Sequence, residues 1–370
     1  MGLFSFTDKS KRRPEVEAVL KTLIDPHFGQ DWLSLGFIER LSVEREVVSL
    51  ALQLPYPARS LALGFRDSIE AALKAAGFKP TNIEVNLNVL RARPQQGLPG
   101  LERVKNIVAV ASGKGGVGKS TTAVNLALAL AAEGARVGIL DADIYGPSQP
   151  LMLGIPTGTK PEVEEEKWFK PLGAHGIDAM SIGFLLDGDN VPVVWRGPKA
   201  TGALLQLLTQ TLWNDLDYLV VDMPPGTGDI QLTLAQKVPV AGAVIVTTPQ
   251  DIALLDARKG IEMFRKVEIP VLGVVENMAI HVCSNCGHAE HVFGEGGGER
   301  IADEYQTQLL GALPLDLSIR QSADNGTPSV AADPYGDIAT RYREIAIKVG
   351  VAIAKGSRQD SKKIPNIVFE

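Results

Sequence analysis

Residues 113–120 of the chain read Gly113-Lys114-Gly115-Gly116-Val117-Gly118-Lys119-Ser120. This stretch fits the pattern G-x-x-x-x-G-K-[S/T] of a loop that wraps phosphate groups. A strand-like apolar run, Ile107–Ala111, precedes it, and a helix-like run, Thr121–Glu133, follows it. Backbone N–H groups of such a loop, together with the positive end of the following helix, surround phosphate oxygens. We therefore expect residues Gly113 to Thr121 to bind ATP. The alternative is a glycine-rich strand-to-helix turn that binds nothing.

Three side chains of this loop have separate predicted roles. Lys119 is expected to reach the β- and γ-phosphates, and the Ser120 hydroxyl is expected to bind Mg²⁺. Lys114 is an additional lysine directly after the first glycine. On the pattern alone it is either an ordinary solvent-exposed lysine or a second cation that acts on phosphate.

From Val104 onward, short β-branched runs alternate with helical segments. Continuous apolar runs of this kind suit parallel strands that are buried on both faces. The runs are Ile107–Ala111, Val137–Leu140, Tyr218–Val221, Ala243–Thr247 and Val271–Val275. The alternation predicts an α/β domain over residues 104–355, with the three-layer P-loop NTPase fold, a mostly parallel sheet and right-handed crossovers.

Carboxylates follow two of these strands, at the sheet edge where nucleotide-binding folds place their chemistry. Asp141 and Asp143 follow the second run, and Asp222 follows the third. We predict that Asp222 holds Mg²⁺ directly or through water, and that Asp143 orients the attacking water. Asp229 lies on a glycine-rich loop that is placed to sense the γ-phosphate. For each aspartate the alternative is a structural role at a strand end or helix cap.

The first 92 residues predict a separate small α+β domain. The expected helices are Glu15–Leu23 and Leu61–Ala76, and the expected strands are Phe37–Val43, Val47–Gln53 and Ile83–Leu90. Proline, glycine and glutamine dominate the segment that follows, so residues 93–103 are predicted to be a linker. The polar residues 356–370 predict a loose C-terminal tail.

Composition argues against several classes of protein. With 37 Lys and Arg against 43 Asp and Glu, the net charge is −6, which gives no general affinity for nucleic acid. No apolar run approaches the roughly 20 residues of a membrane-spanning helix. A short apolar piece precedes the first basic residues, which is the reverse of a signal peptide. We expect a cytoplasmic protein that binds neither nucleic acid nor membrane.

The chain contains two cysteines, Cys283 and Cys286, in one C-x-x-C motif. Two thiolates on a tight turn suit a soft metal but supply only half of a tetrahedral site. A symmetric homodimer would bring a second pair, and four thiolates can hold a [4Fe–4S] cluster or zinc. Within one chain, His288 and His291 could instead complete a zinc site. The third interpretation is a redox-active dithiol.

The chain resembles the Mrp/ApbC family of iron–sulfur carrier ATPases over roughly residues 104–350. The two-lysine loop is of the deviant Walker A type found in the MinD/ParA class of P-loop ATPases. Further motifs that carry the resemblance are D-A-D-I-Y-G-P-S (141–148), W-R-G-P (195–198), D-M-P-P-G-T-G-D (222–229), E-N-M (276–278) and the C-x-x-C. The family implies a homodimer that binds a [4Fe–4S] cluster between its C-x-x-C motifs. It passes the cluster to apo-proteins, with ATP binding and hydrolysis involved.

The resemblance also implies roles for individual residues and partners. Lys114 would reach across the homodimer to the phosphates bound by the other subunit, and Asn277 and Pro314 would lie near the adenine. The implied partners are apo iron–sulfur client proteins and scaffold proteins. The first domain resembles the small domain that begins many bacterial members. Some relatives carry a cysteine after its second strand, but residues 55–59 here read P-Y-P-A-R. We therefore expect partner binding or scaffolding, rather than metal binding, by this domain.

Two other functions fit parts of the sequence. A positioning switch of the MinD/ParA kind would use the same loop to control binding to DNA or membrane. The end of the chain lacks a basic amphipathic helix of the MinD kind, however, and a switch leaves the C-x-x-C without a role. A zinc-stabilised P-loop scaffold with little turnover is the second alternative.

Overall fold

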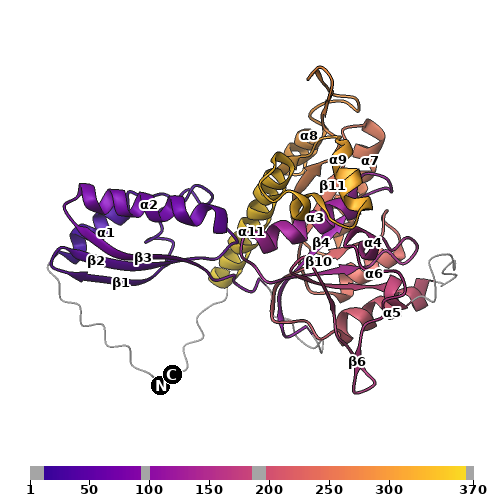
Figure 1. Cartoon of the computed structure of the whole chain (residues 1–370), viewed down its shortest axis with the longest axis horizontal. Helices are drawn as coiled ribbons and strands as arrows, with labels where there is room; N and C mark the ends of the chain where they lie inside the picture. Colours follow the sequence, from indigo (N-terminus) through magenta and orange to yellow (C-terminus); the bar gives the residue numbers. More distant parts are fainter. Residues whose placement is uncertain (1–11, 93–100, 186–196, 364–370) are drawn as a thin grey trace. The chain divides into compact units, whose positions relative to one another are not determined.

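The computed structural model describes residues 12–92, 101–185 and 197–363 (Figure 1). Contacts between residues divide the chain into two compact units, Met1–Leu90 and Arg91–Glu370. The predicted domain end at residue 92 lies next to this division. Residues 93–100 of the predicted linker, residues 364–370 of the predicted tail, and Trp195 and Arg196 of the W-R-G-P motif lie outside the described residues.

The first unit is a small sheet packed against helices. Its elements are α1 (Arg13–Leu20), β1 (Ile38–Glu44), β2 (Val47–Leu54), α2 (Arg59–Ala75) and β3 (Lys79–Leu87). The strand order is β1-β2-β3, with β1 and β2 antiparallel and β2 and β3 parallel. A parallel pair needs a crossover connection, and α2 supplies it while packing on β3. This arrangement agrees with the predicted α+β domain.

The second unit is built on an eight-stranded sheet with the order β15-β12-β11-β4-β10-β5-β9-β8. Neighbouring strands are parallel, except that β8 at one edge runs antiparallel to β9. The strands are β4 (Val104–Ala111), β5 (Val137–Asp141), β8 (Leu172–Ala174), β9 (Ile177–Ser181), β10 (Leu216–Asp222), β11 (Val240–Thr247), β12 (Val271–Glu276) and β15 (Leu309–Ala312). The five predicted strands form its contiguous centre, β12 to β5, which confirms the predicted α/β fold.

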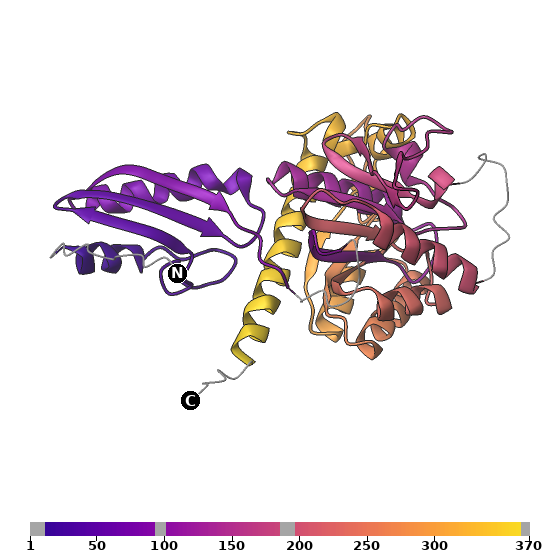
Figure 2. The same ribbon diagram turned by 90° about the horizontal axis from the view of Figure 1, so that it is seen from below.

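Helices cover both faces of this sheet and complete the three predicted layers (Figure 2). On one face, α3 (Lys119–Ala132) packs against α11 (Asp337–Lys363). The other face carries a row of neighbouring helices: α5 (Gly197–Gln210), α6 (Asp229–Lys237), α7 (Asp251–Lys266) and α8 (Gly297–Glu304). The short elements are α4 (Gln149–Met152), α9 (Leu317–Asp324), α10 (Ser329–Ala332), the 3-10 turn Ile182–Leu185, and the hairpins β6 (Val163–Glu164) with β7 (Trp168–Phe169) and β13 (His281–Val282) with β14 (Ala289–Glu290).

The centre of the sheet is buried on both faces, as its continuous apolar strands predict. Every residue of β10 and β11 is buried. Helix α3 is also buried along most of its length, because it lies between the sheet and α11. This packing fixes the ends of β4, β5 and β10, from which the candidate site is built.

The C-terminal segment differs from the expectation. The polar sequence predicts a loose tail from residue 356, whereas α11 continues to Lys363. Ser357 is buried and its hydroxyl donates to the carbonyl oxygen of Ile353 at 3.0 Å, so the helix still packs where the tail was expected to begin. Within the described ranges, no helix is both long enough and apolar enough to cross a membrane.

Candidate functional site

The phosphate-binding loop joins β4 to α3, and three of its positions require glycine. Gly116 and Gly118 have φ values of 80° and 81°, in the left-handed region that glycine adopts without strain. A Cβ atom on Gly113 would lie 2.0 Å from the carbonyl oxygen of Asp256. A Cβ atom on Gly118 would lie 2.1 Å from Nδ2 of Asn277. The loop therefore takes this shape because its glycines leave space for neighbouring segments.

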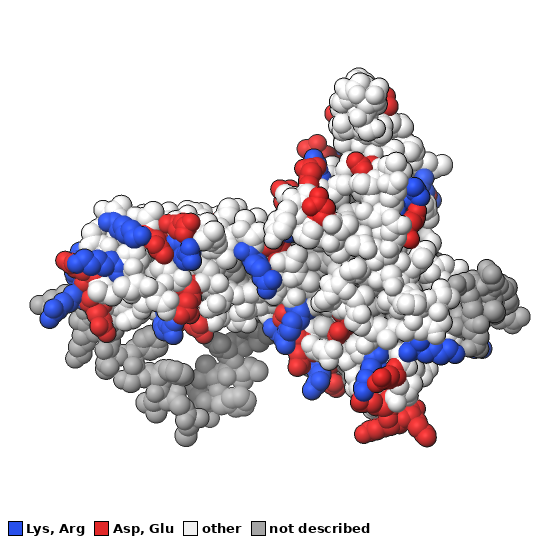
Figure 3. Space-filling view, in the orientation of Figure 1, with Lys and Arg blue, Asp and Glu red and all other residues white. Residues whose placement is uncertain are grey.

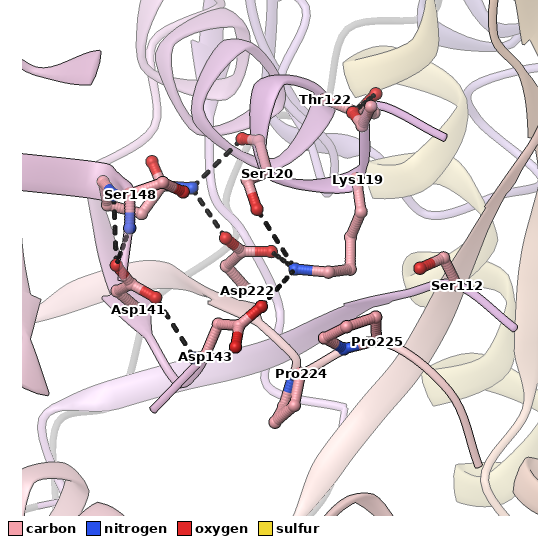
Figure 4. A network of polar contacts seen from close by, with 12 residues as sticks. Ser112, Lys119, Ser120, Thr122, Asp141, Asp143, Ser148, Asp222, Pro224 and Pro225 are labelled. Atoms are coloured by element: carbon pink, nitrogen blue, oxygen red, sulfur yellow. Dashed lines mark hydrogen bonds and ion pairs between the residues drawn. The ribbon is translucent and has the colours of Figure 1, made fainter. Parts of the chain in front are cut away.

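Lys119 points into a cluster of oxygen atoms from α3, β10 and the segment that follows β5 (Figure 4). Its Nζ lies 2.5 Å from Oδ1 of Asp222, 3.1 Å from Oγ of Ser120 and 3.9 Å from Oδ2 of Asp143. Asp222 is fully buried, and Lys119 is only 6% exposed. A buried carboxylate without a partner is costly, so the ammonium group compensates the charge of Asp222.

These oxygen atoms also suit Mg²⁺, which prefers carboxylate, hydroxyl and water oxygens. They already converge on one cation, the ammonium group of Lys119. Because both contact that ammonium group, the carboxylate of Asp222 and the hydroxyl of Ser120 face the same space. These two residues would hold the metal ion, which neutralises charge on the β- and γ-phosphates.

Sheet register explains why residues distant in sequence meet here. Strand β10 lies between β4 and β5, and Asp222 is aligned with Val110 on one side and Asp141 on the other. The loop follows β4, Asp143 follows β5, and Asp222 ends β10. Parallel strands bring their carboxyl ends to one edge, so the predicted residues gather as the strand assignments require.

Asp141 has a structural position inside this cluster. Its carboxylate is fully buried. It accepts hydrogen bonds from the backbone N–H groups of Asp143 (3.1 Å), Ser148 (3.0 Å) and Gln149 (3.0 Å) and from the hydroxyl of Ser181 (3.1 Å). These bonds anchor the chain that follows β5, including the start of α4. Asp141 therefore has the structural role at a strand end that was considered as the alternative to a catalytic one.

Burial changes the acidity of both aspartates that follow β5. For Asp141, burial is the main cause and the charge of Asp222 the second, and together they raise its pKa to about 7. For Asp143, burial raises the pKa, whereas the nearby Lys119 opposes that rise. A carboxylate with a raised pKa accepts a proton from water more readily, so the surroundings of Asp143 suit the predicted role.

Gln149 is a member of the site that sequence reasoning did not identify. Its side chain is 1% exposed. Its Nε2 donates to the backbone oxygen of Ser120 at 3.0 Å and to Oδ2 of Asp222 at 2.8 Å. The one sequence feature that could have identified Gln149 is its position directly after the D-A-D-I-Y-G-P-S motif.

Two predicted residues make fewer contacts. Lys114 is partly exposed, and its backbone oxygen accepts a hydrogen bond from the hydroxyl of Ser112 at 2.8 Å. Among the described residues, no ion pair involves its side chain. Asp229 is exposed and is the first residue of α6, where a carboxylate stabilises the helix dipole. The loop before it is tied to the site, because Gly226 donates to the backbone oxygen of Ser112 at 2.9 Å.

The two residues expected near the adenine, Asn277 and Pro314, have different surroundings. Asn277 is buried, and its Nδ2 donates to the backbone oxygen of Val117 at 2.9 Å, which fixes it against the phosphate-binding loop. Pro314 lines a cavity of about 410 Å³ together with residues of α9, α10 and α11, but Asn277 is not among its lining residues. The adenine position therefore stays a prediction.

Cys283 and Cys286 lie on the turn between β13 and β14, the two antiparallel strands of a short hairpin. Cys283 is partly exposed and Cys286 is exposed. Cys283 donates its N–H to the carbonyl of His288 at 2.9 Å, and Gly287 closes the turn by donating to Cys283 at 2.8 Å. Backbone N–H groups of Cys286 and Asn285 lower the pKa of the Cys283 thiol. The turn therefore presents two accessible thiols and favours the thiolate that a metal needs.

The histidines near this turn do not complete a metal site. Nδ1 of His291 lies 2.7 Å from the carbonyl oxygen of Ala279, in the segment between β12 and β13. In the part of the chain that the structure describes, no group of three or more His, Cys, Asp or Glu residues is placed to hold a metal ion. The Cys₂His₂ alternative therefore has no preformed site among the residues that the structure describes.

Figure 3 shows one face of the second unit, whose projecting tip is mostly white with red side chains at its margins. Red and blue side chains are interspersed over the rest of that face, and the upper part of the second unit is mostly white.

The phosphate-binding loop between β4 and α3, with Asp222 at the end of the adjacent strand, defines a P-loop NTPase. A family model described as "NUBPL iron-transfer P-loop NTPase" matches residues 103–350. The chain belongs to this family, which confirms the family resemblance seen in its motifs. A second family model, "Iron-sulfur cluster assembly protein", matches residues 13–85.

Individual relatives agree with this assignment. The chain is 68% identical over 274 residues to an "Iron-sulfur cluster carrier protein" of Pseudomonas fragi, covering 74% of this chain and 95% of the relative. It is 50% identical over 342 residues to a protein of the same name from Escherichia coli K12, covering 92% of each chain. A solved nucleotide-binding protein from Archaeoglobus fulgidus, in complex with ADP, aligns with a TM-score of 0.57 and 38% identity. That alignment covers 65% of this chain and 92% of the other.

Proposed function

We propose that this chain is an ATP-dependent iron–sulfur cluster carrier that binds a [4Fe–4S] cluster as cargo and transfers it to apo-proteins in the cytoplasm. The observation that carries the proposal is the pair of accessible thiols, Cys283 and Cys286, in a chain that also contains a complete phosphate-binding loop. The names of the bacterial relatives and the family membership support it.

Ligand counting supports a homodimer as the carrier. A cubane cluster usually takes four thiolates, and one chain has two. A two-fold axis beside the hairpin would supply the second pair without any further residue. The exposure of Cys286 leaves room for such an approach. We therefore propose one [4Fe–4S] cluster per homodimer, shared between the two hairpins.

The nucleotide site assigns separate tasks to the residues around Lys119. Lys119 binds the β- and γ-phosphates, and Ser120 and Asp222 hold Mg²⁺. Asp143 orients the attacking water and can accept its proton. Lys114 of one subunit acts on the phosphates bound by the other, which is consistent with a side chain that forms no ion pair within the described residues. Asn277 and Pro314 contact the adenine in this proposal.

The first unit is proposed to bind partner proteins, namely apo iron–sulfur clients and scaffold proteins. It contains no cysteine, because the only two cysteines of the chain lie in the second unit. The first unit therefore cannot supply a thiolate ligand to the cluster. The match of residues 13–85 to an iron–sulfur cluster assembly family supports a role in the same process.

A cluster-transfer assay tests the proposal. Anaerobically reconstituted protein is mixed with an apo-enzyme that needs a [4Fe–4S] cluster, and recovery of the activity of that enzyme is followed with and without ATP. We expect transfer from the wild type and none from Cys286→Ala. A protein that purifies and reconstitutes with zinc alone would favour the zinc-stabilised scaffold. ATP-dependent binding to DNA or membrane, with no cluster, would favour the MinD/ParA-like switch.

A further inference from the structure

The side-chain amide of Gln149 touches both residues that are proposed to hold Mg²⁺. Its Nε2 donates to the backbone oxygen of Ser120 at 3.0 Å and to Oδ2 of Asp222 at 2.8 Å. An amide nitrogen has two hydrogens, so both are used. One rigid group therefore sets the distance between the phosphate-binding loop and the end of β10.

We propose that Gln149 is a positioning residue for the Mg²⁺ of the nucleotide site. This inference rests on the proposed binding of Mg-ATP. Among the described residues, the carboxylate of Asp222 has two side-chain partners, Lys119 on Oδ1 and Gln149 on Oδ2. When Lys119 moves to the phosphates, Gln149 remains. It would keep the carboxylate in place, so that Oδ1 of Asp222 and the hydroxyl of Ser120 would be the two oxygens that hold Mg²⁺.

The backbone of Gln149 is anchored independently of its side chain. The carboxylate of Asp141 accepts the N–H groups of Ser148 and Gln149 at 3.0 Å each, so the start of α4 is tied to the end of β5. Changing the side chain of Gln149 leaves those two bonds in place. A substitution there therefore tests the amide group rather than the fold of the segment.

The amide oxygen of Gln149, Oε1, also supports a position of this side chain beside a hydrated metal ion. Oε1 of Gln149 is buried and has no hydrogen-bond partner among the described residues. A buried acceptor without a donor is unfavourable, whereas a water bound to Mg²⁺ can donate to it. Groups that orient metal ligands typically affect metal affinity by about 10–100-fold when they are removed.

The test compares affinity for fluorescently labelled ATP in excess Mg²⁺ with affinity in EDTA. Gln149→Met keeps the size of the side chain but removes both hydrogen bonds. We expect the Mg²⁺-dependent gain in affinity to fall at least about ten-fold, while the affinity in EDTA stays within about two-fold of wild type. Gln206→Leu, at an exposed position on α5, is the control and should behave as wild type.

Each outcome has a defined meaning. An unchanged Mg²⁺-dependent gain in Gln149→Met, or an equal loss in Mg²⁺ and in EDTA, overturns the positioning role. A wild type that binds ATP without any help from Mg²⁺ overturns both this role and the proposed nucleotide site. If Gln149→Met does not fold, Gln149→Asn decides the question. Its shorter amide cannot reach both acceptors, so the same selective loss is expected, and wild-type behaviour contradicts the inference.

Discussion

Replacing the glycines of the phosphate-binding loop by alanine should lower the folding free energy by different amounts, which depend on the φ angle and the free space at each glycine. Gly115 has no heavy atom within 4 Å of an added Cβ, and its φ is not in the left-handed region, so Gly115→Ala is the control. Gly116 also has open space, but its φ of 80° makes alanine cost about 1–2 kcal/mol. Gly118→Ala adds a collision with Nδ2 of Asn277 to the same backbone strain.

The expected loss of folding free energy for Gly118→Ala is about 2–4 kcal/mol. The left-handed backbone contributes about 1–2 kcal/mol, and displacing Asn277 from Val117 removes a hydrogen bond worth about 0.5–1.5 kcal/mol. Repacking around the added methyl group accounts for the rest. Gly115→Ala should stay within about 0.5 kcal/mol of wild type.

Urea denaturation followed by circular dichroism measures this series, with labelled-ATP binding on the same samples. Gly118→Ala combined with Asn277→Ala should cost less than the sum of the single changes, because the collision is relieved. Equal costs for Gly115→Ala and Gly118→Ala would refute the reasoning. Strict additivity of the Gly118 and Asn277 substitutions would show that the two side chains do not meet.

Three further outcomes are expected. Lys119→Ala should weaken ATP binding by about 1.5–3 kcal/mol, measured by titration of labelled ATP, and unchanged affinity would exclude a phosphate contact. Mixed dimers of Lys114→Ala and Asp143→Asn subunits should regain part of the ATPase rate that each variant loses alone, because one of their two sites combines an intact Lys114 with an intact Asp143. No recovery in demonstrated mixed dimers would exclude action of Lys114 across the interface. Asp25→Ala should destabilise the first unit by about 2–5 kcal/mol, because the buried donors Trp32 (3.0 Å) and Tyr56 (2.7 Å) lose their acceptor at about 1–3 kcal/mol each, while ATP affinity should not change.

The centre of the fold was predictable because its strands are continuous apolar runs buried on both faces. The outer strands were not. Strand β8 has only three residues and β15 only four, and β9 carries Asp178 within its five residues. Such short or mixed segments have no periodicity that separates them from loops, and their pairing with longer neighbours makes them strands.

The same contrast holds within the site. The meeting of Lys119, Asp143 and Asp222 follows from three motifs at the ends of adjacent parallel strands. The contact of Gln149 with Asp222 does not, because it depends on how the chain after β5 folds back as α4. The exposed position of Asp229 at the start of α6 likewise depends on the loop conformation, which sequence spacing does not determine.

Anaerobic reconstitution of the wild type, Cys283→Ala and Cys286→Ala tests the carrier account most directly, through iron and sulfide content and molecular mass. Each substitution removes two of the four ligands from a homodimer, so neither variant should hold a stable cluster. ATP affinity should survive in both. The wild type should contain about four irons and four sulfides per dimer. A full cluster on a monomer, or one retained by either single-cysteine variant, would contradict the account.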